Sequence, residues 1–188
     1  MPPKVRFKRE QIIAAATDVV RAAGMPALTA RALSDKLNCS VAPIFSEFSN
    51  MEEVRGAVIA QAKKIYESYI AEGLRHQLPF KGAGLKYIEF AKTEPNLFKV
   101  LFMSENRVHI DDFMLLDDNN AKIVGALTSS WSLDINTARE LHKNIMLFTH
   151  GIAVLCASGS CDFSDDEISE RLTFAFTAML KEIKGDGK

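Results

Sequence analysis

The stretch LTARALSDKLNCSVAPIFSEFSNMEEV, residues 28–54, decides the fold, because two short helices separated by a tight break fit inside it. Thr29 is typical of a helix N-cap and precedes a short helix that turns Leu33 inward. Asn38 breaks this helix, and Ser40 is predicted to cap the second one. The stretch therefore predicts a helix-turn-helix.

The flanking sequence continues the helical pattern. Residues 9–23 carry apolar side chains three and four positions apart, which predicts a helix with one apolar face. Gly24 follows at the place where a helix stop is expected. On the other side, Ser49 and Asn50 are predicted to open a long helix from about Met51 to Arg75.

The rest of the chain predicts more helices and no strands. Pro79 and the Gly82/Gly84 pair predict a break after the long helix. Ser164 and Glu167 form a capping-box pattern that predicts the start of the last helix. The fold class is therefore all-α, with a domain of residues 1–50 and a second domain of residues 51–188. The helices expected in the second domain after the break are 84–93, 95–103, 113–131, 135–158 and 165–184.

The second short helix is the candidate recognition helix. A helix-turn-helix places this helix in the DNA major groove, where small and apolar side chains can contact thymine methyl groups. Hydroxyl groups and the helix N-terminus can contact phosphate. The candidate DNA-binding residues on it are Ser40, Val41, Ala42, Pro43 and Phe45.

Residues 9–54 resemble the DNA-binding domain of the tetracycline-repressor (TetR) family in the order, spacing and apolar identity of the whole module. Residues 87–102 and the pair His150-Gly151 resemble ligand-domain helices of one TetR subgroup. The resemblance implies a cytoplasmic homodimeric repressor that a small molecule in the C-terminal domain releases from DNA. The matching residues of the module are Ile12, Ala15, Ala16, Gly24, Leu28, Thr29, Leu33, Ser34, Cys39, Ser40, Ile44, Phe45, Phe48 and Asn50–Val54.

Four positions depart from the family pattern where DNA contact is expected. Ala42, Phe45, Glu47 and Met51 stand where the family usually has Gly, Tyr, His and Lys. The last three changes weaken phosphate neutralisation, which supplies most nucleic-acid affinity. An alternative function is therefore a sensor or partner-binding protein on the TetR scaffold with weakened DNA binding. The remaining candidate DNA contacts outside the recognition helix are Lys8, Arg9, Thr29 and Arg31.

The C-terminal domain is expected to bind a small, largely apolar effector and to form the dimer. Helices 135–158 and 165–184 carry more apolar side chains than a monomer of this size can bury, so a two-fold four-helix interface is predicted. Aromatic and Met side chains at helical spacing supply candidate pocket residues. These are Phe90, Phe98, Phe102, Met103, Met114, Trp131 and Phe148.

Composition excludes several other classes. The 188 residues are 47% hydrophobic and 25% charged with a net charge of −1, which is a globular profile without a basic excess. No apolar stretch is long enough to span a membrane, and the first residues lack the apolar core of a signal peptide. Three cysteines without Cys-x-x-Cys spacing fit a reduced cytoplasm, although Cys156 and Cys161 could also form a redox pair.

No enzyme, cofactor or metal is expected from the motifs. The chain lacks a nucleophile elbow, a phosphate-binding Gly-rich loop and a His-Glu-x-x-His pattern. His142 and His150 have no third ligand at a useful spacing, so a metal site is not expected.

Overall fold

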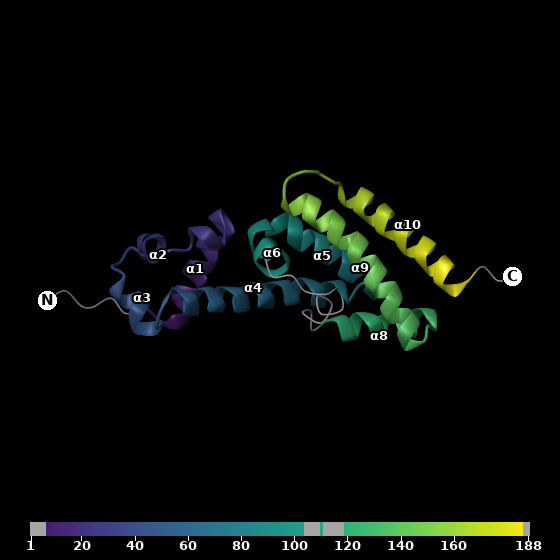
Figure 1. Ribbon diagram of the computed structural model, residues 1–188, viewed down its shortest axis with the longest axis horizontal. Helices are drawn as coiled ribbons and strands as arrows, with labels where there is room; N and C mark the ends of the chain where they lie inside the picture. Colours follow the sequence, from purple (N-terminus) through teal and green to yellow (C-terminus); the bar gives the residue numbers. More distant parts are fainter. Residues whose placement is uncertain (1–6, 104–109, 111–118, 186–188) are drawn as a thin grey trace. The chain divides into compact units, whose positions relative to one another are not determined.

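The computed structural model describes residues 7–103, 110 and 119–185, and within these ranges every regular element is a helix (Figure 1). This confirms the all-α prediction. The chain forms two compact units. The first comprises Met1–Ile65 with Glu94–Ser104, and the second comprises Tyr66–Thr93 with Glu105–Lys188.

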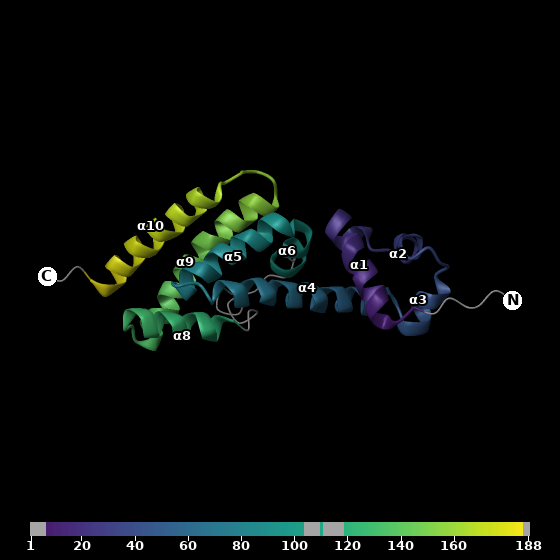
Figure 2. The same cartoon turned by 180° about the vertical axis from the view of Figure 1, so that it is seen from behind.

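The first unit contains the predicted helix-turn-helix. Its elements are α1 (Arg9–Ala23), the short 3-10 turn η1 (Met25–Ala27), α2 (Ala30–Lys36), α3 (Ala42–Glu47), the first part of α4 (Met51–Gly73) and α6 (Pro95–Phe102). Helix α1 packs against η1, α2 and α6 (Figure 2). Its buried face follows the predicted periodicity and includes Ile12, Ala16 and Val20, all fully buried.

Local side-chain chemistry explains the turn between α2 and α3. The Thr29 hydroxyl accepts a hydrogen bond from the Ala32 N–H at 3.1 Å, which confirms the predicted cap. Asn38 adopts a left-handed conformation with φ of 50°, which asparagine tolerates better than most residues, and it reverses the chain after α2.

The predicted Ser40 cap of α3 is wrong. The helix begins one residue later, with Val41 at the N-cap and no side-chain cap. The Val41 carbonyl accepts from the N–H groups of Ile44 and Phe45, so Ser40 lies one position too early to cap the helix. The exposed Ser40 hydroxyl is therefore not committed to the α3 backbone.

Helix α6 packs with α1, so the first unit extends beyond the predicted helix-turn-helix domain. The Arg21 guanidinium donates to both carboxylate oxygens of Glu94 at 3.0 Å. This pairing raises the pKa of Arg21. The Asn96 side chain donates to the Arg21 carbonyl at 2.8 Å, which places the start of α6 beside the end of α1.

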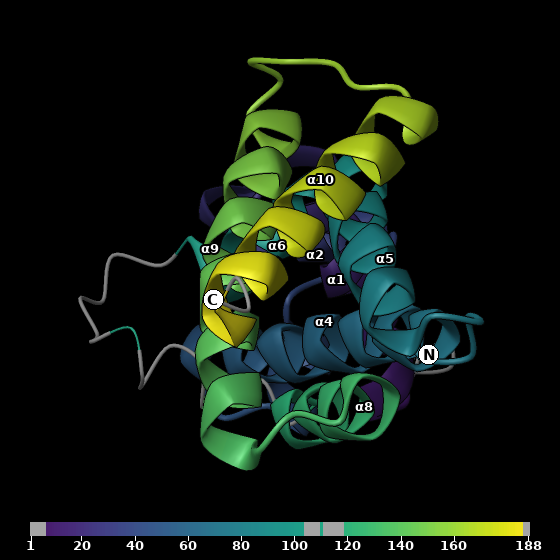
Figure 3. The same cartoon turned by 90° about the vertical axis from the view of Figure 1, so that its right-hand side faces the viewer.

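The second unit is a helical bundle around α9. It contains α5 (Pro79–Thr93), α8 (Asn120–Trp131), α9 (Ile135–Ala157) and α10 (Asp165–Lys184), together with the end of α4. Helix α9 packs against α5, α8 and α10, and Figure 3 shows α10 running beside α9. Ala138, Leu141 and Leu127 are fully buried in its core.

The predicted break at Pro79, Gly82 and Gly84 is wrong, because all three residues lie within α5. Pro79 is the first helical residue, where its missing N–H group is not needed. Gly82 is required for its small size, because its backbone lies against that of Gly73 of α4. A Cβ atom at Gly73 would lie 2.5 Å from the Gly82 carbonyl oxygen. The two glycines permit close helix packing.

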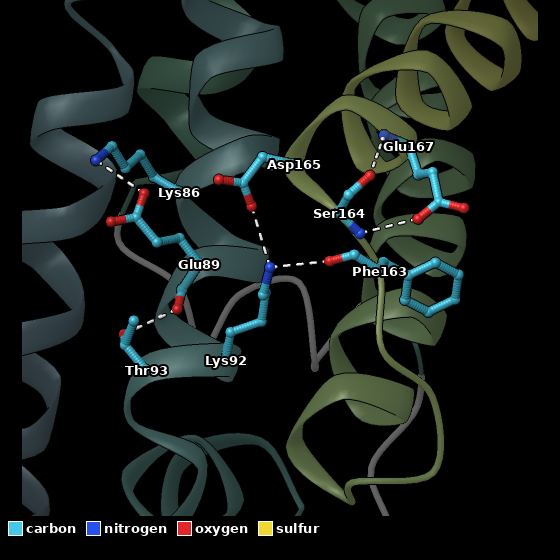
Figure 4. A network of polar contacts seen from close by, with 8 residues as sticks. All are labelled: Lys86, Glu89, Lys92, Thr93, Phe163, Ser164, Asp165 and Glu167. Carbon is cyan, nitrogen blue, oxygen red and sulfur yellow. Dashed lines mark hydrogen bonds and ion pairs between the residues drawn. The ribbon is translucent and has the colours of Figure 1, made fainter.

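A polar network fixes the start of α10 against α5 (Figure 4). The Lys92 ammonium donates to the Phe163 carbonyl and to the Asp165 carboxylate, both at 3.0 Å. Ser164 and Glu167 form the predicted capping box, with each side chain accepting from the backbone N–H of the other. These bonds set the position at which α10 starts along α5.

Candidate nucleic-acid interface and apolar cavity

Helix α3 separates its buried and exposed side chains sharply. Ile44 is fully buried and Phe48 is 2% exposed, whereas Val41 is 42% exposed and Phe45 is 43% exposed. Ser40 and Ala42 are exposed as well, and Pro43 is half-buried. The predicted contact residues of α3 therefore form a largely accessible surface of apolar groups and one hydroxyl, called here the α3 surface (Ser40, Val41, Ala42, Pro43 and Phe45).

Arg9 has a structural role that the sequence did not reveal. Its guanidinium donates to the Glu47 carbonyl at 2.6 Å and to the Glu53 carboxylate at 2.7 Å, and lies 4.0 Å from the Phe48 ring centroid. The Ser49 N–H and Arg9 together lower the pKa of Glu53. Arg9 thus joins the start of α1 to the end of α3 and the start of α4.

We expect Arg9→Ala to destabilise the protein by about 1–2 kcal/mol, because a guanidinium with two hydrogen bonds and an aromatic contact is lost. The melting temperature should fall by about 2–8 °C in a thermal unfolding measurement. Lys8→Ala is the matched control, since the Lys8 side chain is exposed. Equal melting temperatures for the two variants would contradict the structural role of Arg9.

The other predicted DNA contacts belong to the first unit as well. Lys8 is exposed, and its backbone N–H donates to the Gln11 side chain. Thr29 is exposed although its hydroxyl caps α2. The Arg31 side chain is exposed and forms no ion pair in the described part of the chain. Glu47, one of the departures from the family pattern, is exposed too.

A cavity of about 200 Å³ lies inside the second unit. Side chains of α4, α5, α8, α9 and α10 line it, so its wall forms only when these five helices pack together. Most of the wall is apolar. The lining includes Tyr66, Ile70, Phe80, Ala83, Tyr87, Ile123, Trp131, Ile145, Met146, Leu172 and Phe176.

Two polar pairs lie on the cavity wall or next to it. The His142 Nε2–H donates to the Asn120 side-chain oxygen at 2.7 Å, and both residues line the cavity. Tyr87 lines the cavity as well, and its hydroxyl bonds to His150 Nδ1 at 2.9 Å. Burial lowers the pKa of His150 and so favours its neutral form.

Of the six predicted pocket residues that the structure describes, Trp131 alone lines this cavity. Phe90 is fully buried against Tyr66 and Tyr69, and Phe148 packs on the core cluster around α9. Three others belong to the first unit, where Phe98 and Phe102 pack at 5.2 Å and Met103 is 42% exposed. Met114 lies outside the described residues.

Within the described ranges, no three His, Cys, Asp or Glu side chains lie close enough together to hold a metal ion. None of the described helices is both long enough and apolar enough to cross a membrane. Cys39, Cys156 and Cys161 are free thiols, and burial raises the pKa of Cys156.

The fold matches solved structures over nearly the whole chain. A TetR-like transcriptional regulator from Rhodococcus sp. RHA1 superposes with a TM-score of 0.67 at 15% identity, covering 93% of this chain and 98% of that one. A TetR-family member from Streptomyces coelicolor A3 superposes with a TM-score of 0.61 at 21% identity, covering 89% of this chain and 96% of that one. A TetR variant from Acinetobacter baumannii AYE in complex with minocycline superposes with a TM-score of 0.59 at 16% identity. The match covers 95% of this chain and 97% of that one.

The sequence itself matches no family model and no curated protein. The structural likeness nevertheless covers both compact units and agrees with the resemblance of residues 9–54. The chain has the fold of the TetR-family transcriptional regulators.

Proposed function

We propose that this protein is a transcriptional repressor that binds operator DNA as a homodimer and is released by a small, largely apolar effector. The observation that carries the proposal is the exposure of Val41 and Phe45 on a helix whose other large side chains, Ile44 and Phe48, are buried. An exposed apolar surface on the second helix of a helix-turn-helix fits thymine methyl groups in the major groove.

Two exposed basic side chains of the first unit support the proposed contacts with DNA phosphates. Arg31 is exposed without an ion pair in the described part of the chain, and Lys8 is exposed at the start of α1. Guanidinium and ammonium groups of this kind bind phosphates and position a protein on the duplex. Arg9 is a weaker candidate than the sequence predicts, because Glu53 already neutralises it.

The second unit supports the effector and the dimer. An apolar cavity with a few polar groups is the usual form of a small-molecule site, and one structural neighbour was solved with minocycline. Leu147 and Leu155 of α9 and Phe174 of α10 are large exposed apolar side chains, with Phe174 76% exposed. A second copy of the chain would cover them in a two-fold interface.

The proposal is tested by selecting operator DNA from a random pool with the purified protein and titrating the selected site. We expect sequence-specific binding whose affinity falls with salt. Arg31→Ala should weaken binding and lower the slope of log affinity against log salt by about one per protomer. Lys64→Ala, which replaces a lysine of α4 outside the helix-turn-helix, is the control and should leave affinity unchanged.

The alternative sensor function would show itself in the same titration. The exposed Glu47 carboxylate and the neutralised Arg9 favour it, since both reduce the attraction of the α3 region for phosphate. Binding that stays weak at low salt and shows no sequence preference would support the alternative and contradict the repressor.

A further inference from the structure

The cavity has a continuous aromatic wall that ends at a polar pair. The ring centroids of Trp131 and Phe176 lie 5.1 Å apart, those of Phe176 and Phe80 5.2 Å apart, and those of Phe80 and His142 6.0 Å apart. These distances are typical of favourable aromatic contacts. The wall therefore runs from the end of α8 across α10 and α5 to α9, where His142 meets Asn120.

The three large aromatic side chains of this wall are only partly buried. Phe80, Trp131 and Phe176 pack against the core cluster around α9 but are not enclosed by it, and all three line the cavity. The end of α8 is held in place by the Lys184 ammonium, which donates to the Trp131 carbonyl at 3.2 Å. A flat ring entering the cavity would meet aromatic surfaces that the fold has already positioned.

The polar end offers both kinds of hydrogen-bonding group. The Asn120 amide carries donors and an acceptor, and imidazole carries one of each when neutral. His142 is 5% exposed and Asn120 is half-buried, so water reaches the imidazole poorly. A ligand oxygen placed here gains a hydrogen bond, whereas a hydrocarbon would leave polar groups of the wall facing an apolar partner.

The volume of the cavity and the charges on its wall restrict the kinds of ligand that it can bind. A cavity of about 150 Å³ accepts benzene, so about 200 Å³ accommodates a substituted single ring or a small fused ring. Among the described residues of the wall, Lys81 is the one Lys or Arg side chain, and no Asp or Glu is present. A cationic ligand would therefore enter a low-dielectric site without an opposite charge on the described wall.

We propose that the effector is a compact aromatic molecule with a hydroxyl substituent, whose ring lies along Trp131, Phe176 and Phe80 and whose oxygen bonds at His142 and Asn120. The inference deepens the effector part of the proposed function and rests on it. Phenol is the simplest probe of this chemistry.

The test is calorimetric titration of the full-length protein, without DNA, with four probes of similar size: phenol, cyclohexanol, toluene and benzylammonium. We expect phenol to bind at least about tenfold more tightly than each of the others. Trp131 is the single tryptophan of the chain, so its fluorescence should change on phenol binding.

His142→Leu should abolish the preference for phenol over toluene. The ratio of the two affinities should fall from about ten to about one. His76→Leu is the matched control and should keep the preference, because His76 does not line the cavity. Equal affinities for phenol, cyclohexanol and toluene in the unsubstituted protein, or no binding of phenol, would overturn the inference without any variant. DNA binding is measured in a separate titration, so a failure of operator binding would be distinguished from a failure of phenol binding.

Discussion

Phe174→Asp should convert the proposed dimer to a monomer at micromolar concentration. The Phe174 side chain is 76% exposed in the single chain, on an exposed stripe of α10 that also contains Glu170 and Ala178. Burying a Phe side chain contributes about 1.5–3 kcal/mol, and a two-fold interface contains it twice. The dimer dissociation constant should therefore rise by at least about 100-fold.

Sedimentation measures this change directly, and operator titration measures its consequence. A monomer can bind only one half-site, so operator affinity should fall together with dimerisation. Ile59→Asp is the matched control, since Ile59 is also a large exposed apolar residue, at 44%, but lies on α4. A Phe174→Asp variant that sediments as a dimer would contradict the predicted interface of α9 and α10.

Local signals in the sequence predicted much of the fold correctly. The first helix, the Thr29 cap and the Ser164 capping box each depend on residues within one or two turns of each other. The predictions failed where a distant element decides the outcome. Gly82 was interpreted as a break, yet it lies within a helix because the Gly73 backbone of α4 packs against it. The sequence did contain a signal for this outcome, because Gly82 is a small residue inside an amphipathic helical pattern.

The wall of the cavity in the second unit was the hardest part to predict, for a physical reason. Phe90, Phe98 and Trp131 all stand at helical spacing in the sequence, but only tertiary packing decides which ring faces a cavity. The same holds for Arg9, whose partners Glu47 and Glu53 are about forty residues away in sequence. By contrast, the exposure of side chains on α3 follows from local structure, because this six-residue helix buries only Ile44. The DNA contacts of the α3 surface stay a prediction.

Gly82→Ala should destabilise the second unit strongly. A Cβ atom at Gly82 would overlap the Gly73 carbonyl oxygen and the His76 side chain, and the reciprocal Cβ at Gly73 would lie 2.9 Å from the Ala83 Cα. Backbone atoms cannot move aside as a flexible side chain can, so α4 and α5 would have to separate. We expect a loss of about 2–4 kcal/mol in the free energy of unfolding, as in other overpacked sites.

The melting temperature should accordingly fall by about 4–16 °C. Gly84→Ala in the same helix is the matched control, because its Cβ would lie 3.4 Å from the Leu172 side chain, which is an ordinary contact. In a helix interior, alanine is more favourable than glycine by about 1 kcal/mol, so Gly84→Ala should be neutral or stabilising. Both variants gain the same helix propensity, and their difference therefore isolates the close approach of α4 and α5. If Gly82→Ala melts at the same temperature as Gly84→Ala, the two helices do not pack through their glycine backbones.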